Sequence, residues 1–291
     1  MLSVADVDAV VLVYEGFDYS LANNATINGA SATGFGLQGN WAVTNDLPKN
    51  GSNSGSASSV YQTSGLSFGT AFAPTEAGSV KLNTNYNWSR NARTTATIPL
   101  DATASGTVWC GYLVNYATIG NANGGYAREG IATSSGGAAI NLASQLTSNQ
   151  LASDRKLAVS YDNTLSSSGN IPFATGTTYL YLSKYTNVGL PLSGSQTGVA
   201  TTWVMTQPQF ETWVAGGASE ATLGANATVS MADAATTGTY GFDTTGFLAL
   251  QADAPDYNNY QVVAIYDEIR YGTKLKDVYN PDPPATQIII K

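Results

Sequence analysis

The feature that most constrains this chain is a series of short strand-like runs divided by Gly, Ser, Asn and Asp. These runs cover residues 79–82, 93–98, 107–115, 130–132, 157–161, 178–185, 200–205, 228–231, 246–252 and 261–270. Short runs with turn residues between them are typical of a β-sandwich, whereas βαβ proteins alternate strands with helical segments. Only 11% of the residues are charged, so the chain is poor in the Glu and Lys that favour helices. The sequence therefore predicts an all-β fold.

Side-chain alternation is clearest in residues 179–185. A strand there places Tyr179, Tyr181 and Tyr185 on one face and Leu180 and Leu182 on the other, because successive side chains of a strand point to opposite faces. A helix is predicted only at 140–151, where Ser and Asn weaken the pattern. Residues 215–240 are rich in Ala, Gly and Thr and are expected to form a loop with a short strand.

The chain divides into a single sandwich domain over 1–279 and a C-terminal segment over 280–291. The segment begins with a Pro-rich spacer, which cannot join a sheet because proline lacks the N–H donor. It ends in a β-prone stretch that contains Ile288, Ile289 and Ile290. We expect this stretch to pair with an exposed sheet edge, either of this domain or of a neighbouring subunit.

Composition excludes several classes of function. A net charge of −8 repels nucleic acid, and the absence of histidine excludes catalytic triads that need it and His-rich metal sites. Cys110 is the one cysteine and lies in an apolar run, so we expect a buried thiol and no intrachain disulfide. The first 20 residues lack a basic segment and an apolar stretch of membrane-spanning length, so we expect neither a signal peptide nor membrane insertion.

Several stretches resemble the LamG-like, concanavalin A-like domains of bacterial surface proteins and phage structural proteins. They are YEGFDY at 14–19, the segment 34–41, the segment 178–185, Trp203, and DEIRYGT at 267–273. The resemblance spans roughly residues 10–279. It implies a concanavalin A-like (LamG-like) jelly-roll β-sandwich of two antiparallel sheets, in which members bind glycans or build surfaces.

The resemblance also implies a structural calcium ion that ties the first strand to the last through oxygen ligands. The residues placed to supply them are Glu15, Asp18 and Asp267. The alternative is that Asp267 or Glu268 pairs with Arg270 or is solvated. In a regular strand, the adjacent Asp267 and Glu268 point to opposite faces.

Four aromatic residues in loop-like segments are candidates for binding a sugar. Tyr86, Trp88, Tyr257 and Tyr260 have Asn or Asp neighbours, and sugars stack on aromatic rings while amides and carboxylates bind their hydroxyls. The alternative is that these rings cap the core or contact another subunit. No Glu-x-Asp-x-Glu spacing of the kind used by related β-glucanases is present.

These observations favour a non-enzymatic structural or attachment protein on a virion surface, as a capsid decoration or fibre, or in another extracellular assembly. Its partners would be copies of itself, other structural proteins or glycans. The alternative is a secreted carbohydrate-binding module, and a polysaccharide-acting glycosidase ranks third.

Overall fold

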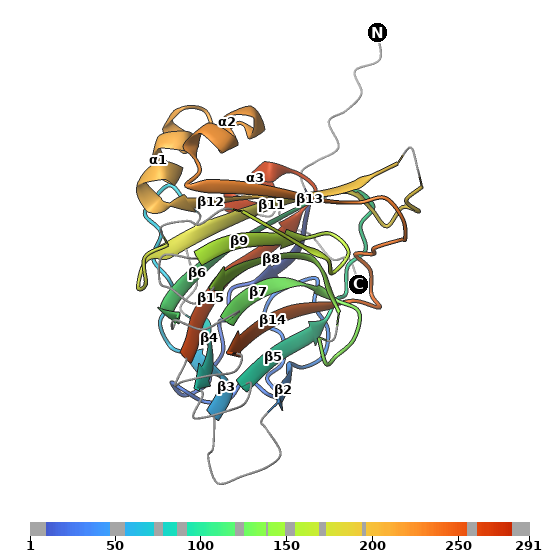
Figure 1. Ribbon diagram of the computed structural model, residues 1–291. Coiled ribbons are helices and arrows are strands. Elements are labelled where there is room, and N and C mark those ends of the chain that lie inside the picture. The colour runs from blue at the N-terminus through green and yellow to red at the C-terminus, as the bar shows by residue number, and fades with distance from the viewer. Residues whose placement is uncertain are drawn as a thin grey trace, which may run out of the picture.

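Two β-sheets pack face to face, and helices cover the outer side of one of them (Figure 1). The computed structural model describes residues 10–46, 56–72, 78–85, 92–119, 125–137, 139–148, 155–168, 173–193, 196–254 and 261–280. The predicted assembly residues Ile288, Ile289 and Ile290 lie outside these ranges, so their pairing stays a prediction. Among the described helices, none is both long and apolar enough to cross a membrane.

The larger sheet has eight strands in the order β13-β12-β11-β6-β15-β4-β3, with β1 pairing with β15. Its strands are β1 (Val11–Glu15), β3 (Ser56–Gln62), β4 (Ser79–Asn85), β6 (Gly106–Ile119), β11 (Thr178–Val188), β12 (Gly198–Thr206), β13 (Val229–Ala235) and β15 (Gln261–Gly272). The first described strand of the chain therefore lies beside the last one, although all the other described strands come between them in sequence.

The smaller sheet has seven strands in the order β10-β9-β8-β7-β14-β5-β2. Its strands are β2 (Ala42–Asp46), β5 (Ala92–Pro99), β7 (Gly125–Ala132), β8 (Ile140–Ser148), β9 (Arg155–Ser160), β10 (Leu165–Ser167) and β14 (Phe247–Ala254). Pairing between the described strands is antiparallel in both sheets. This arrangement confirms the predicted all-β sandwich of two antiparallel sheets.

The core between the sheets is rich in tyrosine. Tyr179, Tyr181 and Tyr185 of β11 point into it, whereas Leu180 and Leu182 point to the outer side of the eight-stranded sheet. The predicted alternation of this strand is therefore confirmed. Other fully or almost fully buried core members are Cys110, Tyr112, Tyr116, Tyr266 and Tyr271.

A helical layer covers the outer face of the eight-stranded sheet. It consists of α1 (Gln207–Ala215), α2 (Glu220–Asn226) and α3 (Leu275–Tyr279). Phe210 and Trp213 of α1 join one apolar cluster with outward-pointing side chains of the sheet. The sheet members of this cluster are Trp109, Leu113, Leu180, Leu182 and Met205. The helices therefore remove from water a sheet face that is too apolar to be left exposed.

Two predictions of local structure were wrong. Residues 140–148 form β8 and not a helix, because pairing with β7 and β9 on both sides outweighs a weak helical pattern. The region expected to be loop contains α2, and α1 begins just before it, after Thr206. The Thr206 N–H donates to Oε1 of Gln209 at 2.9 Å, and Pro208 occupies the first turn, as is common at helix starts.

Candidate functional site

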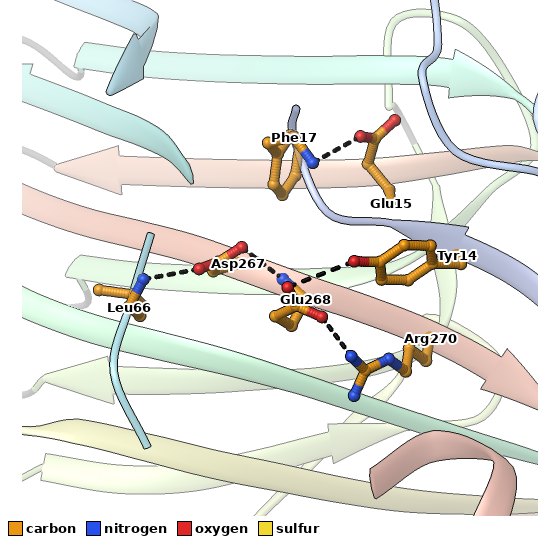
Figure 2. A network of polar contacts seen from close by, with 7 residues as sticks. All are labelled: Tyr14, Glu15, Phe17, Leu66, Asp267, Glu268 and Arg270. Atoms are coloured by element: carbon orange, nitrogen blue, oxygen red, sulfur yellow. Dashed lines mark hydrogen bonds and ion pairs between the residues drawn. The ribbon is translucent and has the colours of Figure 1, made fainter. Parts of the chain in front are cut away.

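Two of the predicted metal ligands, Glu15 and Asp267, lie where the first and last strands meet (Figure 2), and Asp18 follows three residues after Glu15. Glu15 ends β1 and stands opposite Ile269 of β15, two positions from Asp267 along that strand. Glu15 and Asp267 are buried, whereas Asp18 follows the strand and is exposed. The expected meeting of the two strands is therefore present, but only two of the three carboxylates lie in its interior.

A β-bulge in β15 changes the geometry assumed from the sequence. Glu268 has a φ of 55°, and the register with β6 shifts between Asp267 and Arg270. The simple alternation that placed Asp267 and Glu268 on opposite faces does not apply at a bulge, so that expectation was wrong. Glu268 is buried, pairs with Arg270 and accepts a hydrogen bond from the Tyr14 hydroxyl at 3.3 Å. The Glu268–Arg270 pair is one of the alternatives expected at this position.

The buried carboxyl groups at this corner are engaged by the backbone. Asp267 accepts the Leu66 N–H at 2.6 Å on Oδ2 and the Glu268 N–H at 2.8 Å on Oδ1, and Glu15 accepts the Phe17 N–H at 2.8 Å. Burial raises the pKa of Asp267 to about 9 and that of Glu15 to about 7. The described residues contain no metal-binding group of three or more acidic, His or Cys side chains. The calcium site stays a prediction.

A pocket of about 130 Å³ opens beside this corner. It is lined by Tyr14, Gly16, Asp18, Thr33 and Gly34. Pockets for small ligands are commonly about 300–1,000 Å³, so this one is small even for a sugar. We therefore consider the corner a structural junction and look for a binding site elsewhere.

The outer face of the seven-stranded sheet differs in chemistry from that of the eight-stranded sheet. In β14, Leu248 and Leu250 point into the core, so Gln251 and Asp253 point outward. In β7, Ala127 and Ile131 likewise point inward, and Tyr126 and Arg128 point outward. The result is two rows of polar side chains that run across neighbouring strands.

The first row lies near one end of the sheet. Strand register places Arg93, Asp253, Tyr126, Thr147 and Lys156 side by side, in that order. Arg93 forms a salt bridge with Asp253, with 2.7 Å between Nη2 and Oδ2. Arg93, Tyr126, Thr147 and Lys156 are partly accessible to solvent, so this row forms a polar surface open to a ligand.

The second row lies immediately behind the first and is more deeply buried. Register places Thr95, Gln251, Arg128 and Gln145 side by side. Oε1 of Gln251 accepts hydrogen bonds from Nε of Arg128 at 2.8 Å and from the Tyr126 hydroxyl at 3.1 Å. Nε2 of Gln251 donates to Oγ1 of Thr95 at 2.7 Å. Gln251 therefore holds the Arg128 and Tyr126 side chains in place.

Two acceptors in these rows have unused capacity. Oδ1 of Asp253 and Oε1 of Gln145 are buried and find no hydrogen-bond partner within the described part of the chain. Buried polar atoms are normally paired, so unpaired ones indicate a site for water or for a ligand. Burial and the Asp253 charge also raise the pKa of Tyr126, which therefore stays a neutral donor.

The four aromatic residues predicted to bind sugar are Tyr86, Trp88, Tyr257 and Tyr260. They lie outside the described residues, so that prediction is untested. In sequence, however, Trp88 comes five residues before Arg93, and Tyr257 comes four residues after Asp253. Both predicted pairs therefore belong to connections that lead directly to or from the first polar row.

Sequence reasoning missed the residues of the two rows. The signal that was available is the period of two in residues 250–254, where Gln251 and Asp253 alternate with apolar residues. Residues 126–131 show a similar alternation, interrupted by the inward-pointing Glu129. What the sequence does not contain is the order of strands that brings these segments together.

The sequence matches no protein-family model and no curated protein. Solved structures with a similar fold include the carbohydrate recognition domain of Emp47p (8% identity, TM-score 0.41, 86% of this chain and 93% of that one). Arcelin-5, a lectin-like defence protein from Phaseolus vulgaris, is 7% identical (TM-score 0.38, 81% and 99%), and lectin UEA-II complexed with galactose is 8% identical (0.35, 79% and 92%). Likeness at this level concerns the fold alone, and membership of the LamG-like family stays a prediction.

Proposed function

We propose that this protein binds carbohydrate on the outer face of its seven-stranded sheet. The observation that carries the proposal is the pair of polar rows, in which Asp253 and Gln145 each have a buried acceptor without a described partner. Sugar hydroxyls are donors that suit such acceptors, and the half-buried ring of Tyr126 lies beside them. The face thus combines hydrogen-bonding groups with an aromatic surface.

The proposed role is binding without hydrolysis. Cleavage of a glycosidic bond normally needs two carboxyl groups on either side of the bond. The hydrogen-bonded network of the two rows contains one carboxylate, Asp253, and that group is paired with Arg93. The network therefore favours a lectin-like function over the glycosidase alternative.

A location on a virion or another extracellular surface is the finer part of the proposal. Its support is the sequence of the C-terminal segment, which ends in Ile288, Ile289 and Ile290 after a Pro-rich spacer. Light scattering of the full chain and of a chain ending at Tyr279 tests this part. If the full chain assembles and the truncated chain is monomeric, the result supports a structural role. If both chains are monomeric, the result contradicts it.

A glycan array tests the binding function. We expect the wild-type chain to bind a subset of glycans and Asp253→Asn to bind them at least tenfold more weakly, because the variant loses the anionic acceptor and its pair with Arg93. Glu211→Gln, an exposed change on α1 at the opposite sheet, serves as the matched control and should bind as the wild type does. A wild-type chain that binds no glycan, or an unaffected Asp253→Asn variant that unfolds normally, would refute the proposal.

A further inference from the structure

The charge of the two polar rows is unusual for this chain. The protein has 12 Lys and Arg residues against 20 Asp and Glu, yet Arg93, Arg128 and Lys156 all belong to the two rows. Among the described side chains of the two rows, Asp253 is the one acid. Among the described side chains of these rows, cations therefore outnumber acids, in contrast to the chain as a whole.

Arg128 stands at the centre of the face without a carboxylate partner. Its side chain is only 9% exposed, and the ion pairs formed within the described residues do not include it. Its guanidinium lies 5.3 Å from the centroid of the Tyr126 ring, and Nε donates to Gln251. A guanidinium has five N–H donors, and the described residues satisfy only the one on Nε. The four donors on the two terminal nitrogens are available to a ligand.

Leaving a largely buried arginine unpaired is costly, because burial removes water from the charge without supplying a counter-ion. Burial lowers the pKa of Arg128, and the neighbouring Arg93 charge lowers it further, while the Asp253 charge offsets part of the shift. The nearest carboxylate of the network, Asp253, already accepts two nitrogens of Arg93 on Oδ2. The described residues therefore supply no carboxylate that forms an ion pair with Arg128.

We infer that the glycan bound by this face is acidic, and that Arg128 receives a carboxylate or sulfate group of one of its sugar rings. The inference rests on the proposed carbohydrate-binding function and narrows its ligand class. A guanidinium accepts a planar carboxylate through two parallel hydrogen bonds, which adds geometric selectivity to charge. The unpaired oxygens of Asp253 and Gln145 remain for the hydroxyl groups of the same or the next ring.

Access to the face is consistent with this assignment. The described helices pack against the eight-stranded sheet, and Figure 1 shows β5, β7, β8, β9 and β14 with no described helix over them. The 133–137 turn covers the far end of the face, where the Thr97 hydroxyl donates to the Ser135 carbonyl at 2.6 Å. The ligand would therefore lie across the two polar rows and not over the part of the sheet that this turn covers.

The test compares two forms of one polymer. Isothermal titration is carried out with oligogalacturonate, whose rings carry carboxylates, and with its fully methyl-esterified form, in which the same rings are neutral. We expect at least tenfold tighter binding of the acid, a preference that weakens as salt screens the charges. Arg128→Gln should remove the preference. Arg128→Lys should keep part of it, because lysine retains the positive charge but cannot form the two parallel hydrogen bonds of a guanidinium. Lys81→Gln, which removes one cation from the eight-stranded sheet, is the matched control and should keep the preference.

The outcomes separate the two proposals. Equal binding of the acid and the ester, unchanged in Arg128→Gln, would overturn the acidic ligand while leaving the carbohydrate-binding function intact. Binding of neither form, together with an empty glycan array, would overturn both. Tighter binding of a single-stranded oligonucleotide than of either polymer would also overturn the inference. If Arg128→Gln fails to fold, the salt dependence of the wild-type chain for the acid and the ester decides the question.

Discussion

The buried carboxyl of Glu129 offers the sharpest test of the structure. Glu129 is fully buried between the sheets, where it accepts a hydrogen bond from the Tyr271 hydroxyl and contacts Sγ of Cys110 at 3.6 Å. Burial raises its pKa from 4.5 to about 8, and the hydrogen bonds offset only part of that rise. The folded protein therefore holds this group as a neutral acid at pH 7, whereas the unfolded chain releases the proton.

The expected effect follows from this difference. Because the folded pKa is raised, the stabilising contribution of the bound proton is complete below pH 4.5 and is lost as the pH rises towards 8. One pKa unit corresponds to about 1.4 kcal/mol, so Glu129 should lower the free energy of unfolding by about 3 kcal/mol between pH 5 and pH 7. Glu129→Gln has a similar size and cannot ionise. Its stability relative to the wild type should therefore rise by the same amount over this interval.

Urea unfolding followed by tryptophan fluorescence at pH 5, 6, 7 and 8 measures this difference. The difference between variant and wild type is the useful quantity, because Glu15 and Asp267 also titrate with raised pKa values and affect both proteins equally. Glu220→Gln, an exposed change in the surface ion pair with Lys184, should give a difference with little pH dependence. A stability difference for Glu129→Gln that stays constant from pH 5 to pH 8 would refute the proposed burial of a neutral acid.

Three further predictions concern packing. Phe210→Ala should destabilise the protein by about 3–5 kcal/mol in chemical unfolding, because it empties the centre of the helical layer. Gly34→Ala should prevent normal folding or lower the melting temperature strongly, because a Cβ there would lie 1.6 Å from the Tyr14 carbonyl oxygen; unchanged melting would contradict the local structure. Asp233→Ala should cost about 1–3 kcal/mol, since Asp233 joins the edges of the two sheets by accepting the Tyr161 N–H at 2.9 Å, and hydrogen exchange at Tyr161 should accelerate.

The fold class was predictable because it depends on local patterns. The run at 178–185 alternates tyrosine with leucine, and β11 places those two sets on opposite faces as expected. The tyrosine face is nevertheless the interior one. Sequence alone did not decide this, because both sets are large and apolar enough to be buried. The helices of the outer layer, and not the strand itself, determine that the leucine face is buried as well.

The helix errors have a common physical origin. In residues 140–148 the spacing of Leu142 and Leu146 suits a helix turn, but strands β7 and β9 supply backbone partners on both sides. Helix α1 was missed for the opposite reason. Its start carries a local helix signal, a capping Thr206 and Gln209 with Pro208 in the first turn, which the sequence interpretation did not use. Pairing with neighbouring strands thus overrides a weak local preference for helix. A capping motif with proline in the first turn, by contrast, is a local signal that the sequence alone can show.

The candidate site was hidden for a different reason. Strand β14 pairs with β5 on one side and β7 on the other, so Asp253 meets Arg93 across a sequence separation of 160 residues and Gln251 meets Arg128 across 123. Alternation of polar and apolar residues shows which side chains of a strand point outward. Which strands lie next to each other in a sheet depends on pairing between distant parts of the chain. The individual residues were therefore visible as polar positions, while their assembly into two rows was not.

The contrast between the two outer faces explains why one of them is available for binding. The eight-stranded sheet presents Trp109, Leu182 and Met205 outward and needs a helical cover to remove them from water. The seven-stranded sheet instead presents Asp253 and Arg128 outward on its central strands, where an ion pair and hydrogen bonds within the rows hold them. Among the described helices, none packs over this face, and its polar side chains supply the hydrogen bonds and charge by which the proposed ligand would be recognised.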